Sequence, residues 1–384
     1  MDTPLYNLAP ALRLMLLGLV LAVGPLAWVW LRHRGAGPRQ RLAALSLLTL
    51  FLTFDLVLFG AFTRLTDSGL GCPDWPGCYG KASPTGAHAE ISQAQAEMPT
   101  GPVTHGKAWV EMVHRYLATG VGVLITALAI ATWVYRRRGL PVGPGWPAAT
   151  FVWVCVQGAF GALTVTMKLF PAIVTMHLLG GMLLLALLCR QSVAYAQDGA
   201  REPVPAGARA WLIAATALLW AQIALGGWVS TNYAVLACTD FPKCHGTWWP
   251  EMNFGQGFEL WRELGMTAAG DHLTFAALTA IHYTHRLVAY ALLALLAATA
   301  WRLRGGPLRR QARWLGALAA MQLATGLSNV VLGWPLIAAV LHTGGAAALV
   351  VVTTWALAAS RAGATAESGA SMRAAAARST EASA

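Results

Sequence analysis

The residues of this chain that could do chemistry fall in two short stretches, and the second is a near copy of the first. Each stretch has a histidine followed directly by an arginine, with a third ionisable side chain three residues before the histidine. They are Glu111, His114 and Arg115 in the first stretch and His282, His285 and Arg286 in the second. In a helix, residues three and four apart share one face, so each set would stand together. An imidazole inside an apolar helix is a functional-site candidate.

A second pair of histidines repeats in the same way. His177 and His342 are 165 positions apart, and each follows a short turn at the outer end of an apolar segment. With His114 and His285, each half of the chain then offers two imidazoles from two helices. This arrangement can bind a haem iron axially inside a helical bundle. Zinc would need further ligands, and none recurs at that depth in both halves. The alternative is that the histidines only form hydrogen bonds between helices.

The elements that position these residues are apolar segments of membrane-spanning length. The chain has 384 residues, of which 57% are hydrophobic and 11% charged, and its mean hydropathy is +0.54. This composition excludes an ordinary soluble domain. A run of about 20 apolar residues crosses the ~30 Å of a bilayer core. Nine runs qualify, at residues 11–31, 42–63, 108–135, 147–167, 172–190, 210–230, 273–300, 314–332 and 337–359. The first lacks a cleavage site and is expected to be retained.

Arginine clusters follow the first, third, fifth, seventh and ninth spans. The positive-inside rule places these connections and the C-terminus in the cytoplasm. The two long loops, at about 65–107 and 231–272, then face outward. The net charge of +11 therefore reflects orientation in a membrane and gives no reason to expect nucleic acid as a partner.

Matching residues at a fixed spacing indicate an internal repeat. Spans two to five and six to nine would form two four-helix units with the same orientation, related by an axis along the membrane normal. We predict an all-α polytopic membrane protein with an extra N-terminal helix and cytoplasmic loop (1–41), units at 42–209 and 210–360, and a disordered tail at 361–384. Gln157, Gly161, Val165 and His177 reappear 165 residues later, and Gly60, Cys72, Asp74, Pro76, Cys78 and Gly80 reappear 166 residues later.

Four of the six cysteines form Cys-x5-Cys pairs in the outward loops. Such pairs persist as disulfides in an oxidising compartment. For the second pair we favour a structural bond, whereas redox exchange is a further interpretation for the first, which adjoins the predicted N-terminal site. Cys155 and Cys189 lie within spans and are expected to be small core residues. The pairs are Cys72 with Cys78 and Cys238 with Cys244.

The stretch Gly-Ala-Phe-Thr-Arg-Leu-Thr-Asp-Ser-Gly-Leu-Gly-Cys, then Glu-x-x-His-Arg and the duplicated histidines, resembles the haem A synthase family, Cox15/CtaA. The resemblance extends from Leu50 to Ala359 and implies a member with cysteine pairs. It implies an oxidoreductase that converts haem O to haem A, by two successive hydroxylations that turn the C8 methyl into a formyl group. It also implies a bacterial inner membrane, with the cysteine loops in the periplasm.

Site roles follow from the same resemblance. His114 and His177 would bind the substrate, haem O, in the N-terminal half. His285 and His342 would bind a resident haem b in the C-terminal half. Glu111, which the second half replaces with His282, is a candidate to take up protons during the oxidation. Its alternative role is an ion pair with the arginine four residues on.

Arginines near the outer face are candidate contacts for haem propionates, with interfacial snorkelling as the alternative. They are Arg64, Arg115 and Arg286. Asp55 lies deep in the second span, where the repeat has Ala221. It would serve a proton path or bond a neighbouring Ser or Thr.

Two other functions fit part of the pattern. A dihaem b-type electron-transfer cytochrome that oxidises quinol would explain the histidines and leave Glu111 unexplained. A quinone-linked thiol oxidase would leave the four histidines unused. Expected partners are membrane lipid, with a haem O synthase, cytochrome oxidase assembly proteins and a second copy of the chain as candidates. An electron acceptor, a quinone or other, is a further expected partner.

Overall fold

The computed structural model describes residues 9–362. Within them, nine helices are long and apolar enough to cross a membrane, which confirms the nine predicted spans and the all-α polytopic class. The spanning helices are α1 (Ala9–Arg32), α2 (Pro38–Leu65), α4 (His105–Val134), α5 (Gly145–Thr166), α6 (Pro171–Ala196), α7 (Ala206–Thr231), α9 (Phe275–Leu303), α10 (Arg309–Val331) and α11 (Leu336–Ala358).

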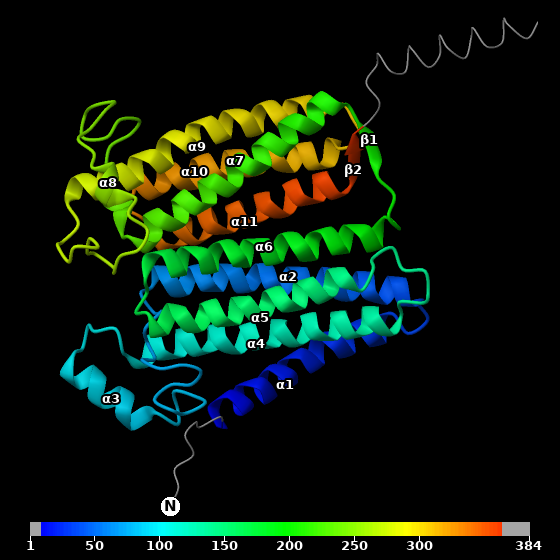
Figure 1. The fold of residues 1–384 in the computed structure, drawn as a ribbon, viewed down its shortest axis with the longest axis horizontal. Helices are drawn as coiled ribbons and strands as arrows, with labels where there is room; N and C mark the ends of the chain where they lie inside the picture. Colours follow the sequence, from blue (N-terminus) through cyan, green and yellow to red (C-terminus); the bar gives the residue numbers. More distant parts are fainter. Residues whose placement is uncertain (1–8, 363–384) are drawn as a thin grey trace, which may run out of the picture.

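Eight of these helices form two groups that lie side by side (Figure 1). In the first group α2, α4, α5 and α6 each contact two neighbours, so that the four close a ring. In the second group α7, α9, α10 and α11 do the same. Helix α6 packs on α7 and α11, and α2 packs on α11, which joins the groups. The apolar core runs through both, with Leu185, Leu212 and Leu315 fully buried.

The histidine-bearing helices begin in the same way in both groups. Thr104 caps α4 by accepting a hydrogen bond from the amide of Lys107 at 3.3 Å. Thr274 caps α9 by accepting one from the amide of Ala277, also at 3.3 Å. An N-cap residue fixes where a helix begins. The two caps therefore place His114 and His285 about three turns into their helices.

The cysteine loops lie together at one end of the helices (Figure 1). The first contains a helix that the sequence analysis did not predict, α3 (His88–Glu97), and the second contains a 3-10 turn, η1 (Ala234–Leu236), and a short helix, α8 (Phe254–Gly257). At the opposite end, β1 (Glu202–Val204) and β2 (Ser360–Ala362) pair as parallel strands. The loops and the strands thus mark opposite ends of the bundle.

The second strand corrects the predicted boundary of the tail. Arg361 and Ala362 pair with Pro203 and Val204, so they are ordered rather than part of a disordered segment. The Arg209 guanidinium also donates to the Ser360 hydroxyl at 2.8 Å. These backbone and side-chain contacts carry the chain two residues beyond the predicted end of the C-terminal unit. The remainder of the predicted tail, 363–384, lies outside the described residues.

Helix α1 packs mainly on α4. A Cβ at Gly18 would lie 2.8 Å from the Cβ of Thr119, and one at Gly120 would lie 3.5 Å from the Cβ of Leu21. The two glycines let the helix backbones approach closely, as small residues do between helices in membranes. The extra N-terminal helix thereby supports the helix that carries His114.

The two cysteines within spans differ in burial. Cys189 is buried, as predicted, and its thiol lies 3.4 Å from the carbonyl oxygen of Val351. Cys155 is exposed, so its predicted place in the core is wrong. Cys155 lies on α5, which packs only on α4 and α6 within its group, so much of the surface of α5 is uncovered.

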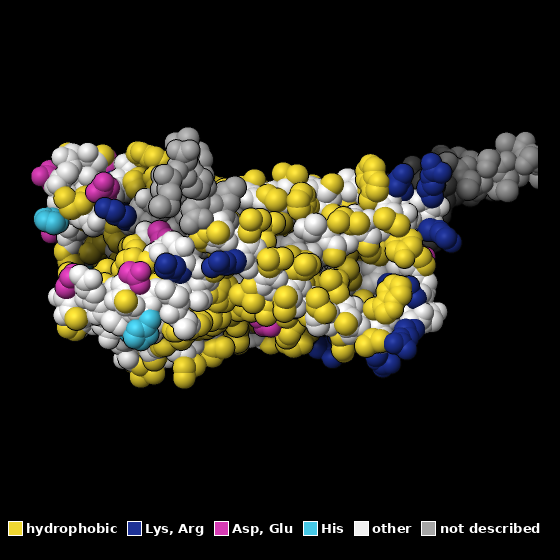
Figure 2. Space-filling view, turned by 90° about the horizontal axis from the view of Figure 1, so that it is seen from below, with side chains coloured by type: hydrophobic (Ala, Val, Ile, Leu, Met, Phe, Trp, Pro, Cys, Tyr) yellow, Lys and Arg dark blue, Asp and Glu magenta, His cyan; other side chains and the backbone are white. Residues whose placement is uncertain are grey.

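Charge is distributed along the long axis of the molecule (Figure 2). Acidic and histidine side chains lie mainly at the end of the cysteine loops, most basic side chains in this view lie toward the end of the strands, and the surface between is largely apolar. This apolar band is what a bilayer core requires of the helices that cross it.

Candidate functional site

Four histidines come from four helices, two in each group. His114 lies on α4 and His177 on α6, whereas His285 lies on α9 and His342 on α11. Within each ring of four helices, the two histidine-bearing helices lie across from one another, α4 from α6 and α9 from α11. The structure therefore places the two histidines of each predicted pair on opposite helices of one ring.

Each imidazole lies against a glycine of a neighbouring helix. A Cβ built on the glycine would come within 3.5 Å of the imidazole Cε1 atom, and three of the four distances are shorter than ordinary van der Waals contact. Without a side chain between them, the ring can rest against the helix backbone, which restricts its position. The distances are 3.0 Å for Gly60 and His114, 3.5 Å for Gly161 and His177, 3.0 Å for Gly226 and His285, and 3.3 Å for Gly326 and His342.

The hydrogen bonds of the imidazoles differ between the groups. In the second group, Thr325 Oγ1 lies 2.9 Å from His342 Nδ1 and donates its own proton to the Met321 carbonyl at 2.8 Å. The threonine oxygen is then free to accept a proton from Nδ1, which leaves Nε2 unprotonated. The side-chain amide nitrogen of Gln222 lies 2.9 Å from His285 Nδ1.

The first group lacks these contacts. Nδ1 of His114 and Nδ1 of His177 are buried without a hydrogen-bond partner among the described residues. At the repeat positions of Gln222 and Thr325 the first group has Leu56 and Phe160, which can neither donate nor accept. Sequence comparison of the halves could have found this difference, because the two substitutions lie at the repeat offsets.

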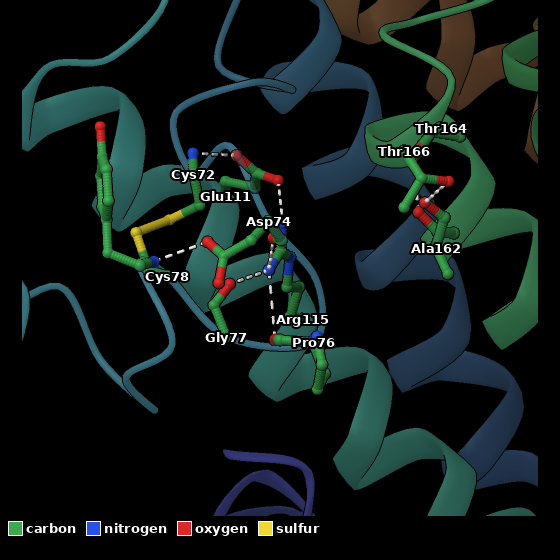
Figure 3. Close-up of polar contacts among 12 residues, drawn as sticks. Cys72, Asp74, Pro76, Gly77, Cys78, Glu111, Arg115, Ala162, Thr164 and Thr166 are labelled. Atoms are coloured by element: carbon green, nitrogen blue, oxygen red, sulfur yellow. Dashed lines mark hydrogen bonds and ion pairs between the residues drawn. A yellow bond between two sulfur atoms is a disulfide. The ribbon is translucent and has the colours of Figure 1, made fainter. Parts of the chain in front are cut away.

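Glu111 lies on α4 one helical turn before His114 and is buried, only 4% exposed. One carboxylate oxygen accepts a hydrogen bond from the Cys72 amide at 2.8 Å, and the other forms an ion pair with Arg115 (Figure 3). The predicted ion pair is thus present, and it accounts for only one of the two oxygens. The counterpart in the second group, His282, lies with Nδ1 3.0 Å from the Ala234 carbonyl.

Both predicted disulfides are present, Cys72–Cys78 and Cys238–Cys244. All four cysteines are 0% exposed. Burial favours a structural role for both bonds, because thiol–disulfide exchange needs access to a sulfur atom. Redox exchange at the first pair would require the loop to open.

Arg115 and Arg286 hold the cysteine loops through loop carbonyls. Each guanidinium donates to three carbonyl oxygens of its loop, in addition to its contact with the ionisable side chain one turn before it. Both arginines are predicted candidates for haem propionate contacts, with interfacial snorkelling as the alternative, and the donors observed here go mainly to the protein backbone. Arg115 reaches Asp74 at 3.1 Å, Pro76 at 3.1 Å and Gly77 at 2.5 Å, and Arg286 reaches Asp240 at 2.6 Å, Lys243 at 2.7 Å and Cys238 at 3.0 Å.

An aspartate closes each disulfide loop, a role that sequence analysis missed although both aspartates belong to the repeat. Asp74 accepts hydrogen bonds from the amides of Tyr79 at 2.6 Å and Gly80 at 2.7 Å. Asp240 binds the repeat-equivalent amides of His245 and Gly246, at 2.8 Å and 2.9 Å. Gly246 and His245 amides hold the pKa of Asp240 below its ordinary value, because they stabilise the carboxylate. Both glycines have positive φ, which the turn requires.

Arg64 connects the two groups at the loop end. It donates to the Ser230 carbonyl at 2.5 Å, pairs with Asp67 at 3.2 Å, and lies over the Tyr233 ring at 4.1 Å. The Tyr233 hydroxyl donates to the same Asp67 carboxylate at 2.7 Å. The contacts of Arg64 with Ser230 and Tyr233, and of Asp67 with Tyr233, tie the end of α2 to the end of α7, a role that helical periodicity does not reveal.

Asp55 is exposed on α2, and no hydrogen bond from its carboxylate to a Ser or Thr is present in the described part of the chain. Of its two predicted roles, the bond to a neighbouring hydroxyl is therefore not observed.

The histidine pairs fit a haem. In each group two imidazoles would hold the iron, and the Thr325 oxygen beside His342 Nδ1 leaves the Nε2 atom of that ring free to bind it. Residues 9–362 contain no group of three or more His, Cys, Asp or Glu side chains placed to hold a metal ion. A porphyrin supplies the four equatorial ligands itself, so two histidines suffice.

Comparison with known proteins gives one consistent family. Residues 43–354 match the COX15-CtaA family, described as cytochrome oxidase assembly protein. The chain is 39% identical to a haem A synthase of Shewanella oneidensis over 319 residues, which covers 81% of this chain and 94% of the relative. It is 30% identical to a haem A synthase of Rhizorhabdus wittichii, covering 84% and 96%, and 27% identical to one of Halalkalibacterium halodurans, covering 75% and 86%.

We expect Gly226→Ala to weaken haem binding in the second group, because the new methyl would meet the His285 ring at 3.0 Å. Overpacking of this kind costs about 1–3 kcal/mol. Gly207→Ala on the same helix is the control, since its Cβ would meet nothing within 4 Å. Haem content of the purified proteins, from the pyridine haemochrome spectrum, measures the effect. Equal haem content in both variants would contradict the inference that Gly226 restricts the position of the His285 ring.

Proposed function

The chain belongs to the COX15-CtaA family, and on that premise we propose that it functions as a haem A synthase. It is an oxidoreductase that converts haem O to haem A by two successive hydroxylations of the C8 methyl, which becomes a formyl group. The observation that carries the proposal is a duplicated histidine pair with a buried carboxylate one helical turn before the first histidine of only one copy. A dihaem electron-transfer cytochrome would need no such difference between its halves.

We assign the substrate, haem O, to the N-terminal four-helix unit and a resident haem b to the C-terminal unit. Haem b, when bound, supplies one-electron transfer. Support comes from the hydrogen bonds of the ligands. The Thr325 oxygen beside His342 Nδ1 favours the tautomer whose Nε2 can bind iron, as partners of metal-bound histidines do. His114 and His177 lack such partners, which suits a ligand that enters and leaves.

We propose that Glu111 accepts protons released as the methyl group is oxidised. It lies one helical turn from His114, and Arg115 and the Cys72 amide fix the orientation of its carboxylate. A general base must be held within reach of the proton that it removes. His282 occupies the corresponding place beside the second histidine pair, where the proposal requires no chemistry on the porphyrin.

We further propose that the protein lies in a bacterial inner membrane with the cysteine loops in the periplasm and the C-terminus in the cytoplasm. The arginine clusters on the connections opposite those loops support this orientation. A haem O synthase makes the substrate and cytochrome oxidase uses the product, so the proteins that handle these steps are candidate partners. Co-purification from native membranes would detect them.

Expressed with a haem O synthase in cells that lack haem A, the native chain should produce haem A or its hydroxylated precursor. Glu111→Gln should retain haem yet lower conversion about 100-fold or more, because general-base catalysis contributes on the order of 10²–10⁴-fold. His114→Ala should abolish conversion. His282→Gln makes the same kind of change at the repeat position and should leave conversion within a few-fold of the native rate.

Separation of extracted haems by chromatography measures these outcomes. Two bound b haems and no modified porphyrin, with ample haem O, would favour the electron-transfer cytochrome instead. Equal losses in Glu111→Gln and His282→Gln would overturn the role assigned to Glu111.

Alkaline phosphatase fused after Pro102 should be active, and the same enzyme fused after Gly139 should be inactive, because phosphatase folds only in the periplasm. The fusion points lie in the first cysteine loop and in the connection after α4. The reverse pattern would invert the proposed orientation.

Thr325→Val should release haem b about 10- to 100-fold faster than the native protein, because it removes the oxygen beside His342 Nδ1 at similar volume. Thr325→Ser keeps the oxygen and should restore slow release. Transfer of haem to excess apomyoglobin gives the rates, and the midpoint potential of the C-terminal haem should shift in the valine variant alone. Identical rates in both variants would refute a positioning role for Thr325.

A further inference from the structure

A cavity of about 580 Å³ lies at the end of the bundle opposite the cysteine loops. Its walls come from both four-helix groups, with Trp146 at the start of α5, Gln191 near the end of α6, Ile213 near the start of α7 and Leu357 near the end of α11. Gln191 is 14 residues beyond His177 on α6, or about 21 Å along the helix axis. The cavity is therefore separate from the histidine sites.

The charge of the cavity is positive. Its lining includes Arg190, Arg201 and Arg209, and no Asp or Glu. Arg209 is engaged with Ser360, but neither Arg190 nor Arg201 forms an ion pair within residues 9–362. Arg190 lies over the Trp146 ring at 4.4 Å, which holds its guanidinium at the cavity wall. Two uncompensated cations thus border one cavity, and they would favour an anionic ligand.

Polar side chains in the cavity lining also lack hydrogen-bond partners. Gln191 is 1% exposed. The Tyr195 hydroxyl one turn further along α6 interacts with this side chain, but neither the amide oxygen nor the amide nitrogen has a partner at hydrogen-bond geometry among the described residues. The side-chain oxygen of Gln197, also in the lining, has none either. Buried amides normally have partners, so a ligand with both donor and acceptor atoms would complete this site.

One flank of the cavity is apolar and open. Ile213 lines it and is 50% exposed on a membrane-spanning helix. Val142, Trp146 and Ala358 add further apolar surface to the lining. The cavity thus places cations and amides without hydrogen-bond partners next to an apolar surface. It does so at the end of the spanning helices, where lipid headgroups contact protein.

From this arrangement we propose that the cavity binds the headgroup of an anionic phospholipid. The phosphate pairs with Arg190 and Arg201, polar headgroup and glycerol atoms satisfy Gln191, and an acyl chain follows the apolar flank past Ile213. Basic pockets between spanning helices are known to take anionic headgroups. Because both four-helix groups contribute walls, the lipid would bridge them. Free phosphate shares the anionic chemistry, but it would leave the apolar flank uncovered.

The test is native mass spectrometry of the full-length, haem-loaded protein in detergent, titrated with phosphatidylglycerol or with phosphatidylcholine of the same acyl chains. We expect phosphatidylglycerol to bind at least tenfold more tightly. The double variant Arg190→Gln/Arg201→Gln should lose most of that preference. Arg136→Gln/Arg137→Gln removes the same charge from exposed residues outside the cavity lining and should keep it.

A third variant distinguishes a loss of lipid binding from a folding defect. Gln191→Leu leaves every arginine in place and should weaken phosphatidylglycerol binding several-fold, with haem spectra and thermal stability in lipid-free detergent unchanged. Equal binding of the two lipids, or equal loss in the two double variants, would overturn the proposal. Inorganic phosphate that displaces phosphatidylglycerol at millimolar concentration would show a phosphate site without the lipid and would also overturn it. None of these outcomes depends on haem chemistry.

Discussion

The close approach of four imidazoles to four glycines is the constraint on which the rest of the structure depends. A ring can rest against a helix backbone only if the two helices are adjacent and in a fixed register, and the two closed rings of helices provide this. The threonine caps of α4 and α9 then set the depth at which two of the rings lie. Loops, caps and helix packing can all be understood as means of holding these four contacts in place.

On this common frame, function depends on a few differences between the units. Both units keep the glycines, the disulfide, the aspartate that closes each loop and the arginine that holds it. They differ at positions near the histidines in the sequence or in the structure, where Glu111 corresponds to His282, Leu56 to Gln222 and Phe160 to Thr325. A small number of substitutions could thus separate a site that exchanges its ligand from one that retains it.

Features that follow from one-dimensional patterns could be predicted from the sequence. The nine spans follow from hydropathy, and the disulfide pairing follows from close cysteines in outward loops. Contacts that depend on where a long side chain extends could not be predicted from the sequence. The periodicity that placed Arg115 beside Glu111 says nothing about carbonyls about 40 residues earlier in the chain. Strand β2 could not be predicted either. It has three residues at the end of an apolar helix, and it is ordered by pairing with β1 rather than by its local composition.

The junction at Arg64 has a consequence for how two such units can be joined at all. Arg64 contacts Ser230 and Asp67 contacts Tyr233, and in both cases the partner is the residue 166 positions later, which is the offset of the repeat itself. Where two identical units meet across a two-fold axis, a residue on the axis faces its own copy, so two arginines or two aspartates would repel one another there. Sequence divergence at this point turns self-repulsion into attraction. A single chain with two unlike halves can therefore place complementary groups at the positions where two identical chains would place like charges.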